Sequence, residues 1–388
     1  MSQQSFPELG VSPPVVRALA AREIHSPFPI QERVLPDALS GLDVLVRSPT
    51  GSGKTLAFAL PIVERTVPSD GRPSALVLVP TRELAAQVCG ELDPLAQAKD
   101  LLVAVAYGGL PLPAQAQRAQ KAHILIATPG RLEDLAERRL IDLAGIRTFV
   151  LDEADRMLDM GFKPQVDRIV RRLPRNRQTM FFSATLDGEA GRLAREYTTS
   201  PSLFESGTSR DEPAEIEHRF VPVTADSKVE TLVEHLRGSY STLIFVRTKR
   251  GADRLVTKLA RHGVRAAAMH GDMRQNARQR ALRQFETGKI GVLVATDVAA
   301  RGLDLDDITH VINFDPPAED KGYVHRTGRT GRAGRSGTAI TLVLPEQQAD
   351  ASRVARRLGH IDQFERAGMR SARPKLLYTS RRGRRSKW

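Results

Sequence analysis

Residues 48–55 read Ser-Pro-Thr-Gly-Ser-Gly-Lys-Thr and directly follow the apolar run Val44, Leu45 and Val46. Residues 56–63 are again mostly apolar, so the pattern predicts a buried strand, a glycine-containing turn and a buried helix, as in a parallel α/β sheet. Glycines in such a turn let backbone N–H groups face phosphate oxygens. A Gly/Ser linker is the alternative, but a linker does not explain the apolar segments that precede and follow the turn.

This segment is therefore expected to bind a nucleoside triphosphate. Lys54 can reach the β- and γ-phosphates, and the Thr55 hydroxyl can bind Mg²⁺. Ser48 stands where the first glycine of such a loop is usual. The expected phosphate-binding residues are Ser48, Pro49, Thr50, Gly51, Ser52, Gly53, Lys54 and Thr55.

A second strand pattern ends in carboxylates, because the apolar residues 149–151 are followed by Asp-Glu-Ala-Asp at residues 152–155. Two adjacent carboxylates at the end of a strand can divide the tasks of holding a metal and activating water. We expect Asp152 to hold Mg²⁺ and Glu153 to orient or deprotonate the attacking water. An acidic turn that caps the next helix is the alternative, and the phosphate loop earlier in the chain argues against it.

The composition indicates how many domains the chain can form and in which cellular compartment it lies. The chain of 388 residues is 41% hydrophobic and 27% charged, which is enough for two cores of ordinary domain size. Its single cysteine excludes an intramolecular disulfide and fits a reducing cytosol. No apolar run approaches the roughly 20 residues that cross a bilayer, and the first residues do not resemble a secretory leader. We therefore expect a cytoplasmic protein without membrane contact.

Apolar strand-like runs alternate with helical patterns in both halves of the chain, which is typical of parallel α/β sheets. In the first half, the runs lie at residues 75–79, 102–106, 124–127, 148–151 and 180–182. In the second half, they lie at residues 219–223, 243–246, 266–269, 292–295, 311–314 and 339–344. The polar stretch between the halves indicates a linker. We expect an N-terminal domain over residues 1–206, a linker over residues 207–216 and a C-terminal domain over residues 217–365.

Residues 366–388 contain nine Lys or Arg residues and no Asp or Glu, in a chain whose net charge is +13. Such a cluster indicates a basic C-terminal tail without packed structure. It suits binding to a polyanion such as nucleic acid. A solvated tail that only aids solubility is the alternative.

The second half has no phosphate loop, but its residues 323–334 contain Arg326, Arg329 and Arg332 at a spacing of three. Glycines repeat at the same spacing and weaken a helix, so the run fits a helix end from which arginines project into a cleft. Arginines placed across an interface can stabilise the charge of a phosphate in its transition state. An exposed basic helix face is the alternative.

Taken in order, these motifs closely resemble those of the DEAD-box ATP-dependent RNA helicase family, over about residues 6–344. Each motif is weak alone, and their joint order is specific. Further matches are Pro-Thr-Arg-Glu-Leu-Ala at 80–85, Gly-Gly at 108–109, Thr-Pro-Gly-Arg at 128–131, Ser-Ala-Thr at 183–185, His-Gly-Asp at 270–272, Ala-Thr-Asp at 295–297 and Arg-Gly-Leu-Asp at 301–304. The resemblance implies a minimal bacterial form with two tandem RecA-like α/β domains that face each other across a cleft.

The resemblance also implies how ATP is recognised. The amide of Gln31 would read the adenine edge, Phe6 would stack on the ring, and Asp304 would reach the ribose. Without the family pattern, Gln31 fits a polar residue at a helix start and Phe6 fits a hydrophobic contact at a helix entry. Phe28 stands where the family usually has threonine.

For RNA, the resemblance implies sugar-phosphate contacts that do not read bases, so that recognition is largely sequence-independent. Taken singly, each expected residue also fits a helix cap, a turn or a surface charge. The expected RNA contacts are Arg82, Gly109, Thr128, Arg131, Thr248, Gln275, Arg278, Thr296 and Arg301. The residues expected to link the nucleotide and RNA sides are Asp155, Ser183, Thr185 and His325.

The implied activity is RNA-stimulated ATP hydrolysis, coupled to domain closure and local unwinding of short duplexes, with ATP and Mg²⁺ as cofactors. Lys54, Asp152 and Glu153 would act from the first domain, and Arg329 and Arg332 from the second. An ATP-gated RNA clamp or assembly factor is the alternative, and DNA translocation fits less well. The sequence leaves the physiological RNA and any protein partners open.

Overall fold

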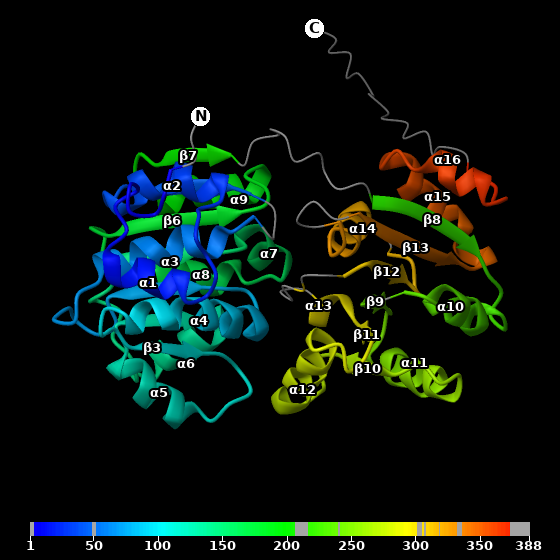
Figure 1. The fold of residues 1–388 in the computed structure, drawn as a ribbon, viewed down its shortest axis with the longest axis horizontal. Coiled ribbons are helices and arrows are strands. Elements are labelled where there is room, and N and C mark those ends of the chain that lie inside the picture. The colour runs from blue at the N-terminus through cyan, green and yellow to red at the C-terminus, as the bar shows by residue number, and fades with distance from the viewer. Residues whose placement is uncertain are drawn as a thin grey trace, which may run out of the picture. The chain divides into compact units, whose positions relative to one another are not determined.

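The computed structural model describes residues 4–48, 52–205, 216–239, 241–300, 305, 308–317, 319–331 and 336–372. The chain divides into two compact units, one of residues 1–212 with 301–306 and one of residues 213–300 with 307–388. Each unit is built on a parallel β-sheet with helices on its faces (Figure 1). The α/β fold class that the sequence predicts is therefore confirmed in both halves. The predicted linker lies outside the described residues, except for Ile216.

The first unit contains a seven-stranded sheet in the order β3-β4-β2-β5-β6-β1-β7, and all of its neighbouring strands are parallel. Its strands are β1 (Val44–Arg47), β2 (Ala75–Leu78), β3 (Val103–Ala106), β4 (Ile124–Ala127), β5 (Thr148–Leu151), β6 (Gln178–Ser183) and β7 (Ser202–Glu205). The strands β2, β4, β5 and β6 are buried along their whole length. A strand covered on both faces is apolar at most positions, which explains the long apolar runs in the sequence.

Helices cover both faces of this sheet. They are α1 (Pro13–Ala20), α2 (Pro29–Leu39), α3 (Lys54–Arg65), α4 (Arg82–Gln97), α5 (Leu112–Lys121), α6 (Pro129–Glu137), α7 (Ala154–Asp159), α8 (Lys163–Val170) and α9 (Gly188–Tyr197). Neighbouring residues of a strand point to opposite faces. On β5, Val150 therefore packs into the core that contains α1 to α4, whereas Phe149 and Leu151 pack into the core that contains α5 to α9.

The second unit contains a six-stranded sheet in the order β10-β11-β9-β12-β13-β8, again with parallel neighbours. Its strands are β8 (Ile216–Pro222), β9 (Thr242–Phe245), β10 (Ala266–Met269), β11 (Val292–Ala295), β12 (His310–Asn313) and β13 (Gly337–Val343). Its helices are α10 (Lys228–Leu236), α11 (Lys249–Arg261), α12 (Gln275–Glu286), α13 (Asp297–Ala300), α14 (Asp320–Thr327), the 3₁₀ turn η1 (Pro345–Gln347), α15 (Gln348–Arg357) and α16 (Ile361–Arg366).

The last described helices, α15 and α16, form a cap on the second unit, which we call the C-terminal cap. Its residues after α16 are packed, because Met369 is buried and the Ala372 backbone N–H donates to Ser352 Oγ at 3.0 Å. Arg356 Nη1 donates to the Ala372 carbonyl oxygen at 2.8 Å. Residues 366–372, which the sequence assigns to the basic tail, thus belong to the packed unit. Residues 373–388 lie outside the described residues.

Candidate nucleotide and RNA sites

The phosphate loop follows β1, which lies beside β6 in the first sheet. The Ser48 backbone N–H donates to the Ser183 carbonyl oxygen at 3.0 Å, and Ser48 Oγ donates to Ser52 Oγ at 2.5 Å. Gly53 precedes α3 with φ at 80°, a left-handed conformation that suits glycine. Lys54 begins α3, is buried, and donates its Nζ to the Ser48 carbonyl oxygen at 3.2 Å. Pro49, Thr50 and Gly51 lie outside the described residues.

Gln31 connects this loop to the start of α2. Its side chain is buried, its Oε1 accepts from the Phe28 backbone N–H at 2.9 Å, and its Nε2 donates to the Gly53 carbonyl oxygen at 2.9 Å. A Cβ at position 53 would lie 2.5 Å from Phe28 Cδ2 and 2.7 Å from Gln31 Nε2, so this contact requires glycine. The Phe28 side chain is 58% exposed, whereas Phe6 is packed in the core and 1% exposed.

The two carboxylates after β5 lie at the same edge of the sheet as the phosphate loop, because β5 and β1 both neighbour β6. Asp152 is buried, and its Oδ1 accepts from the Glu153 backbone N–H at 2.9 Å. Burial raises the pKa of Asp152 to about 6; Lys54 opposes this shift, and the carboxylates of Glu153 and Asp155 add to it. A buried carboxylate surrounded by others is stabilised by a nearby cation, so Asp152 fits the metal-binding task that the sequence assigns to it.

Glu153 is held in place by Arg156, which no motif in the sequence indicates as a site residue. Its Oε2 accepts from Arg156 Nη1 in a buried ion pair within the first turn of α7. The backbone of Glu153 has φ at 50°, a left-handed conformation that is uncommon for a residue other than glycine. The spacing of three residues at a helix start is the signal that points to this pair.

Three of the four predicted linking residues lie together beside the acidic pair. The Asp155 backbone N–H donates to Ser183 Oγ at 3.3 Å, and the Thr185 backbone N–H donates to the same oxygen at 3.4 Å. Thr185 Oγ1 donates to Asp155 Oδ2 at 3.4 Å. These contacts join the end of β6 to the start of α7. The fourth residue, His325, lies on α14 of the second unit.

The predicted RNA contacts of the first unit gather at the ends of β2, β3 and β4. Arg82 begins α4, and a Cβ at Gly109 would lie 2.4 Å from its Nη1. Gly109 has φ at 92°, so both its backbone and its surroundings require glycine. Arg131 Nη1 donates to the Leu110 carbonyl oxygen at 3.1 Å. Thr128 precedes α6 at its N-terminus.

The predicted RNA contacts of the second unit include a buried amide without a partner. Gln275 is 7% exposed, and neither its Oε1 nor its Nε2 has a hydrogen-bond partner within the described part of the chain. Leaving a buried polar group unsatisfied costs about 1–3 kcal/mol, so a ligand that supplies a partner would be favoured here. Arg278 and Thr296 are also buried. Thr248 Oγ1 accepts from the Gly251 backbone N–H at 3.0 Å, which is a helix-capping contact.

Two arginines of the run at residues 323–334 differ in position, because Arg326 lies within α14 and Arg329 follows that helix. Arg326 lies in α14 and donates Nε and Nη2 to the two carboxylate oxygens of Asp297, at 2.6 and 2.7 Å. Its Nη1 donates to Asn313 Oδ1 at 3.1 Å and to the Asp315 carbonyl oxygen at 2.6 Å. Arg326 is thus a structural residue. Helix α14 ends at Thr327, as the glycine pattern predicts, so the predicted catalytic arginine at position 329 follows the helix.

Arg301, Asp304 and Arg332 lie outside the described residues.

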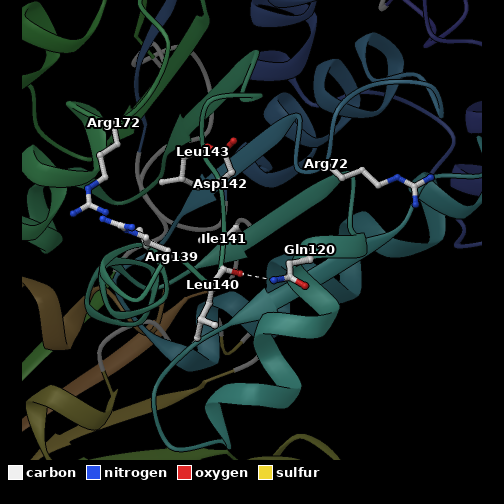
Figure 2. A pocket seen from close by; sticks show the side chains of 9 residues that line it. Arg72, Gln120, Arg139, Leu140, Ile141, Asp142, Leu143 and Arg172 are labelled. Carbon is white, nitrogen blue, oxygen red and sulfur yellow. Dashed lines mark hydrogen bonds between the residues drawn. The ribbon is translucent and has the colours of Figure 1, made fainter.

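A pocket of about 570 Å³ lies away from all of these residues, at the opposite edge of the first sheet. Its lining residues precede strands: Arg72 precedes β2, Leu140 precedes β5 and Arg172 precedes β6. Figure 2 shows Arg139 and Arg172 on one side and Arg72 on the other, with the Gln120 amide donating to the Leu140 carbonyl oxygen at 2.9 Å. No predicted site residue lines this pocket.

Among the described residues, none of the helices has the length and apolar character needed to cross a membrane.

Two parallel sheets in tandem, the first with a phosphate loop beside an acidic pair, define a two-domain phosphate-loop protein of the RecA-like class. Family models agree: residues 28–193 match the DEAD/DEAH box helicase model, and residues 227–334 match the helicase conserved C-terminal domain. The chain belongs to the DEAD-box ATP-dependent RNA helicase family.

Relatives in this family are bacterial proteins named CshA. The DEAD-box ATP-dependent RNA helicase CshA of Geobacillus kaustophilus is 38% identical over 376 residues, covering 96% of this chain and 79% of the relative. CshA of Streptococcus pneumoniae is 41% identical over 345 residues. That alignment covers 88% of this chain and 66% of the relative, so the chain spans just under two thirds of its length.

Solved structures also resemble this chain. Saccharomyces cerevisiae Dbp5 bound to RNA and ADP BeF3 superposes with a TM-score of 0.79 at 31% identity, covering 95% of both chains. Mss116p bound to ssRNA and AMP-PNP superposes with a TM-score of 0.81 at 26% identity, covering 96% of this chain and 80% of the other.

Proposed function

We propose that this protein is an RNA-stimulated ATPase that couples ATP hydrolysis to closure of its two units and to local unwinding of short RNA duplexes. Membership of the DEAD-box family supports this proposal. Its RNA-binding part is supported by Gln275, whose buried amide has no hydrogen-bond partner among the described residues and lies where the family motif is expected to contact RNA. The RNA substrate and the single cysteine fit a reducing, cytoplasmic compartment.

On the nucleotide side, Lys54 and the start of α3 would bind the phosphates, because a helix N-terminus and a lysine both favour negative charge. Thr55 and Asp152 would hold Mg²⁺, which when bound would neutralise charge on the phosphate oxygens. Gln31 would read the adenine edge once its present bonds to the Phe28 N–H and the Gly53 carbonyl oxygen are exchanged.

Glu153 would orient the attacking water or accept its proton, and the ion pair with Arg156 fixes the direction of its carboxylate. Arg329 and Arg332 would approach the phosphates from the second unit when the two units close. Hydrolysis would therefore depend on closure. The network of Asp155, Ser183 and Thr185 would transmit this state to the RNA side.

RNA would bind through hydroxyl, glycine N–H and arginine groups that recognise phosphate and sugar. Because such groups lie on both units, RNA and ATP would each favour the closed state, and each would raise the affinity for the other. A closed state that fits only a single strand would then separate a short duplex locally.

The test is to measure ATP hydrolysis by the full chain with and without single-stranded RNA, beside separation of a short RNA duplex. We expect RNA to stimulate hydrolysis and ATP to be required for strand separation. An ATPase rate that RNA does not change would contradict the proposal. RNA-stimulated hydrolysis without strand separation would instead favour the RNA clamp.

Residues 373–388 provide a further prediction, because they contain seven Lys or Arg residues and no Asp or Glu. Deleting them should weaken RNA binding and flatten the dependence of log K on log salt, by up to roughly 0.7 per lost phosphate contact. Saturating RNA should restore much of the ATPase rate, because the predicted catalytic residues all lie upstream. The matched control keeps the length and replaces the seven cations by Gln. An unchanged salt dependence in both variants would show that the tail does not bind RNA.

A further inference from the structure

Two histidines from distant parts of the second unit stack on each other. His218 lies on β8, and His360 lies in the turn between α15 and α16. Their ring centroids are 3.8 Å apart with an angle of 23° between the rings. This is close, nearly parallel stacking, and it joins the C-terminal cap to the edge strand of the sheet.

The stack continues to α14, the helix that precedes Arg329. The Tyr323 hydroxyl lies 2.9 Å from His218 Nδ1, and the two rings stack at 5.7 Å. Tyr323 is almost fully buried and packs in one core with Phe220 and Phe364. The rings therefore link β8, α14 and the C-terminal cap into one packed group.

The cap makes a second contact with α14 at its first turn. Arg357 of α15 donates Nε and Nη2 to the two carboxylate oxygens of Asp320, at 2.5 and 2.7 Å. Near the other end of α14, Arg326 is bound to Asp297 of α13. The C-terminal cap thus fixes the start of α14, and the ring stack fixes it at Tyr323. Helix α13 fixes α14 near its end.

Both histidines are suited to a permanent stack at neutral pH. Burial, and to a smaller extent the neighbouring His360, together lower the pKa of His218 to about 4. Burial also lowers the pKa of His360. Both shifts favour the neutral rings, which stack without charge repulsion.

We propose that His360 is a positioning residue for catalysis: through the stack with His218 and Tyr323, it fixes α14 and so sets the position of Arg329. The inference rests on the proposed function, in which Arg329 acts on the phosphates. The family model for this half ends at residue 334, so β8 and the C-terminal cap lie outside it. A misplacement of about 1 Å at a reacting group lowers rates by up to roughly 10²-fold, even when the substitution is distant.

The test compares His360→Ala with His360→Phe, in full chains whose folding is checked by circular dichroism and thermal melting. His360→Ala removes the ring and should lower kcat for RNA-stimulated ATP hydrolysis about 10- to 100-fold, with little change in the KM for ATP. His360→Phe keeps a flat ring and should restore most of kcat. The matched control is His262→Ala, which removes an exposed histidine at the end of α11.

A second variant keeps the proposal testable if His360→Ala folds poorly. Arg357→Ala removes the ion pair to Asp320 at the surface and should also lower kcat more than it changes KM. Normal kcat in folded His360→Ala, or in Arg357→Ala when the first variant does not fold, would overturn the proposal. Equal losses in the alanine and phenylalanine variants would overturn it as well.

Arg329→Ala, measured in the same assay, separates the positioning role of His360 from the catalytic role proposed for Arg329. If Arg329→Ala loses activity and folded His360→Ala does not, the positioning role of His360 is wrong and the proposed function stands. If Arg329→Ala retains full activity, the proposed role of Arg329 itself is wrong.

Discussion

Replacing Glu153 by Gln is expected to lower steady-state ATP turnover by about 10²–10⁴-fold, the range for loss of a general base, while ATP and RNA binding stay nearly intact. Gln keeps the shape of the side chain but removes the charge that orients or deprotonates water. Closed complexes with ATP and RNA should therefore accumulate. The measurement is single-turnover and steady-state hydrolysis beside equilibrium binding of both ligands.

The matched control is Glu133→Gln, because Glu133 also forms an ion pair with an arginine, Arg168, but is not a predicted site residue. This control should hydrolyse ATP at the normal rate. Unchanged turnover in Glu153→Gln would remove Glu153 from the mechanism.

Replacing Arg329 by Ala should lower the rate of hydrolysis by about 10³–10⁵-fold, the effect of an arginine that stabilises transition-state charge in related phosphoryl transfer. The affinity for ATP should change far less, because the arginine acts mainly in the transition state. Lys54→Ala should instead weaken nucleotide binding as well. Rates and affinities are measured separately, by single-turnover hydrolysis and by titration with a non-hydrolysable analogue.

Arg326 lies three residues earlier and gives a control with the same change in charge. Its guanidinium is buried and donates to Asp297 and Asn313, so Arg326→Ala should lower the free energy of unfolding of the second unit by about 1–3 kcal/mol, the cost of leaving a buried acceptor without its donor. Thermal melting of both variants shows how much of each loss of hydrolysis comes from unfolding. If both substitutions act only through unfolding, the arginine run has no catalytic member at these two positions.

Much of the fold could be predicted from the sequence because parallel sheets leave a strong local pattern. Strands such as β4 and β5 are buried on both faces and therefore appear as apolar runs. Strand β7 is not predicted, because at the sheet edge its residues alternate between half-buried and exposed, as at Leu203. The packing of residues 366–372 is also not predicted, because Met369 is buried by contacts with distant parts of the chain.

The candidate site could be predicted where function depends on the type and spacing of neighbouring residues. Lys54 and Asp152 are of this kind, since each follows a buried strand and both strands neighbour β6. The structural partner of Arg326 could not be predicted, because Asp297 is 29 residues away in the sequence and meets it only in the folded unit. The same holds for the stack of His218 and His360, which tertiary folding alone brings together.

We propose that closure of the two units completes one nucleotide site, and the distance between the units reports this closure directly. Fluorophores can be placed on Gln117→Cys in α5 and Lys258→Cys in α11, which are exposed positions outside the predicted sites. The native Cys89 should label slowly, because burial raises the pKa of its thiol to about 11.

Energy transfer between the two labels is measured with no ligand, with a non-hydrolysable ATP analogue, with single-stranded RNA and with both. We predict that the transfer efficiency changes to a single value, that of the closed state, when both ligands are present, and that it changes much less with either ligand alone. An efficiency that is the same in all four conditions, in a chain that still hydrolyses ATP in response to RNA, would contradict it.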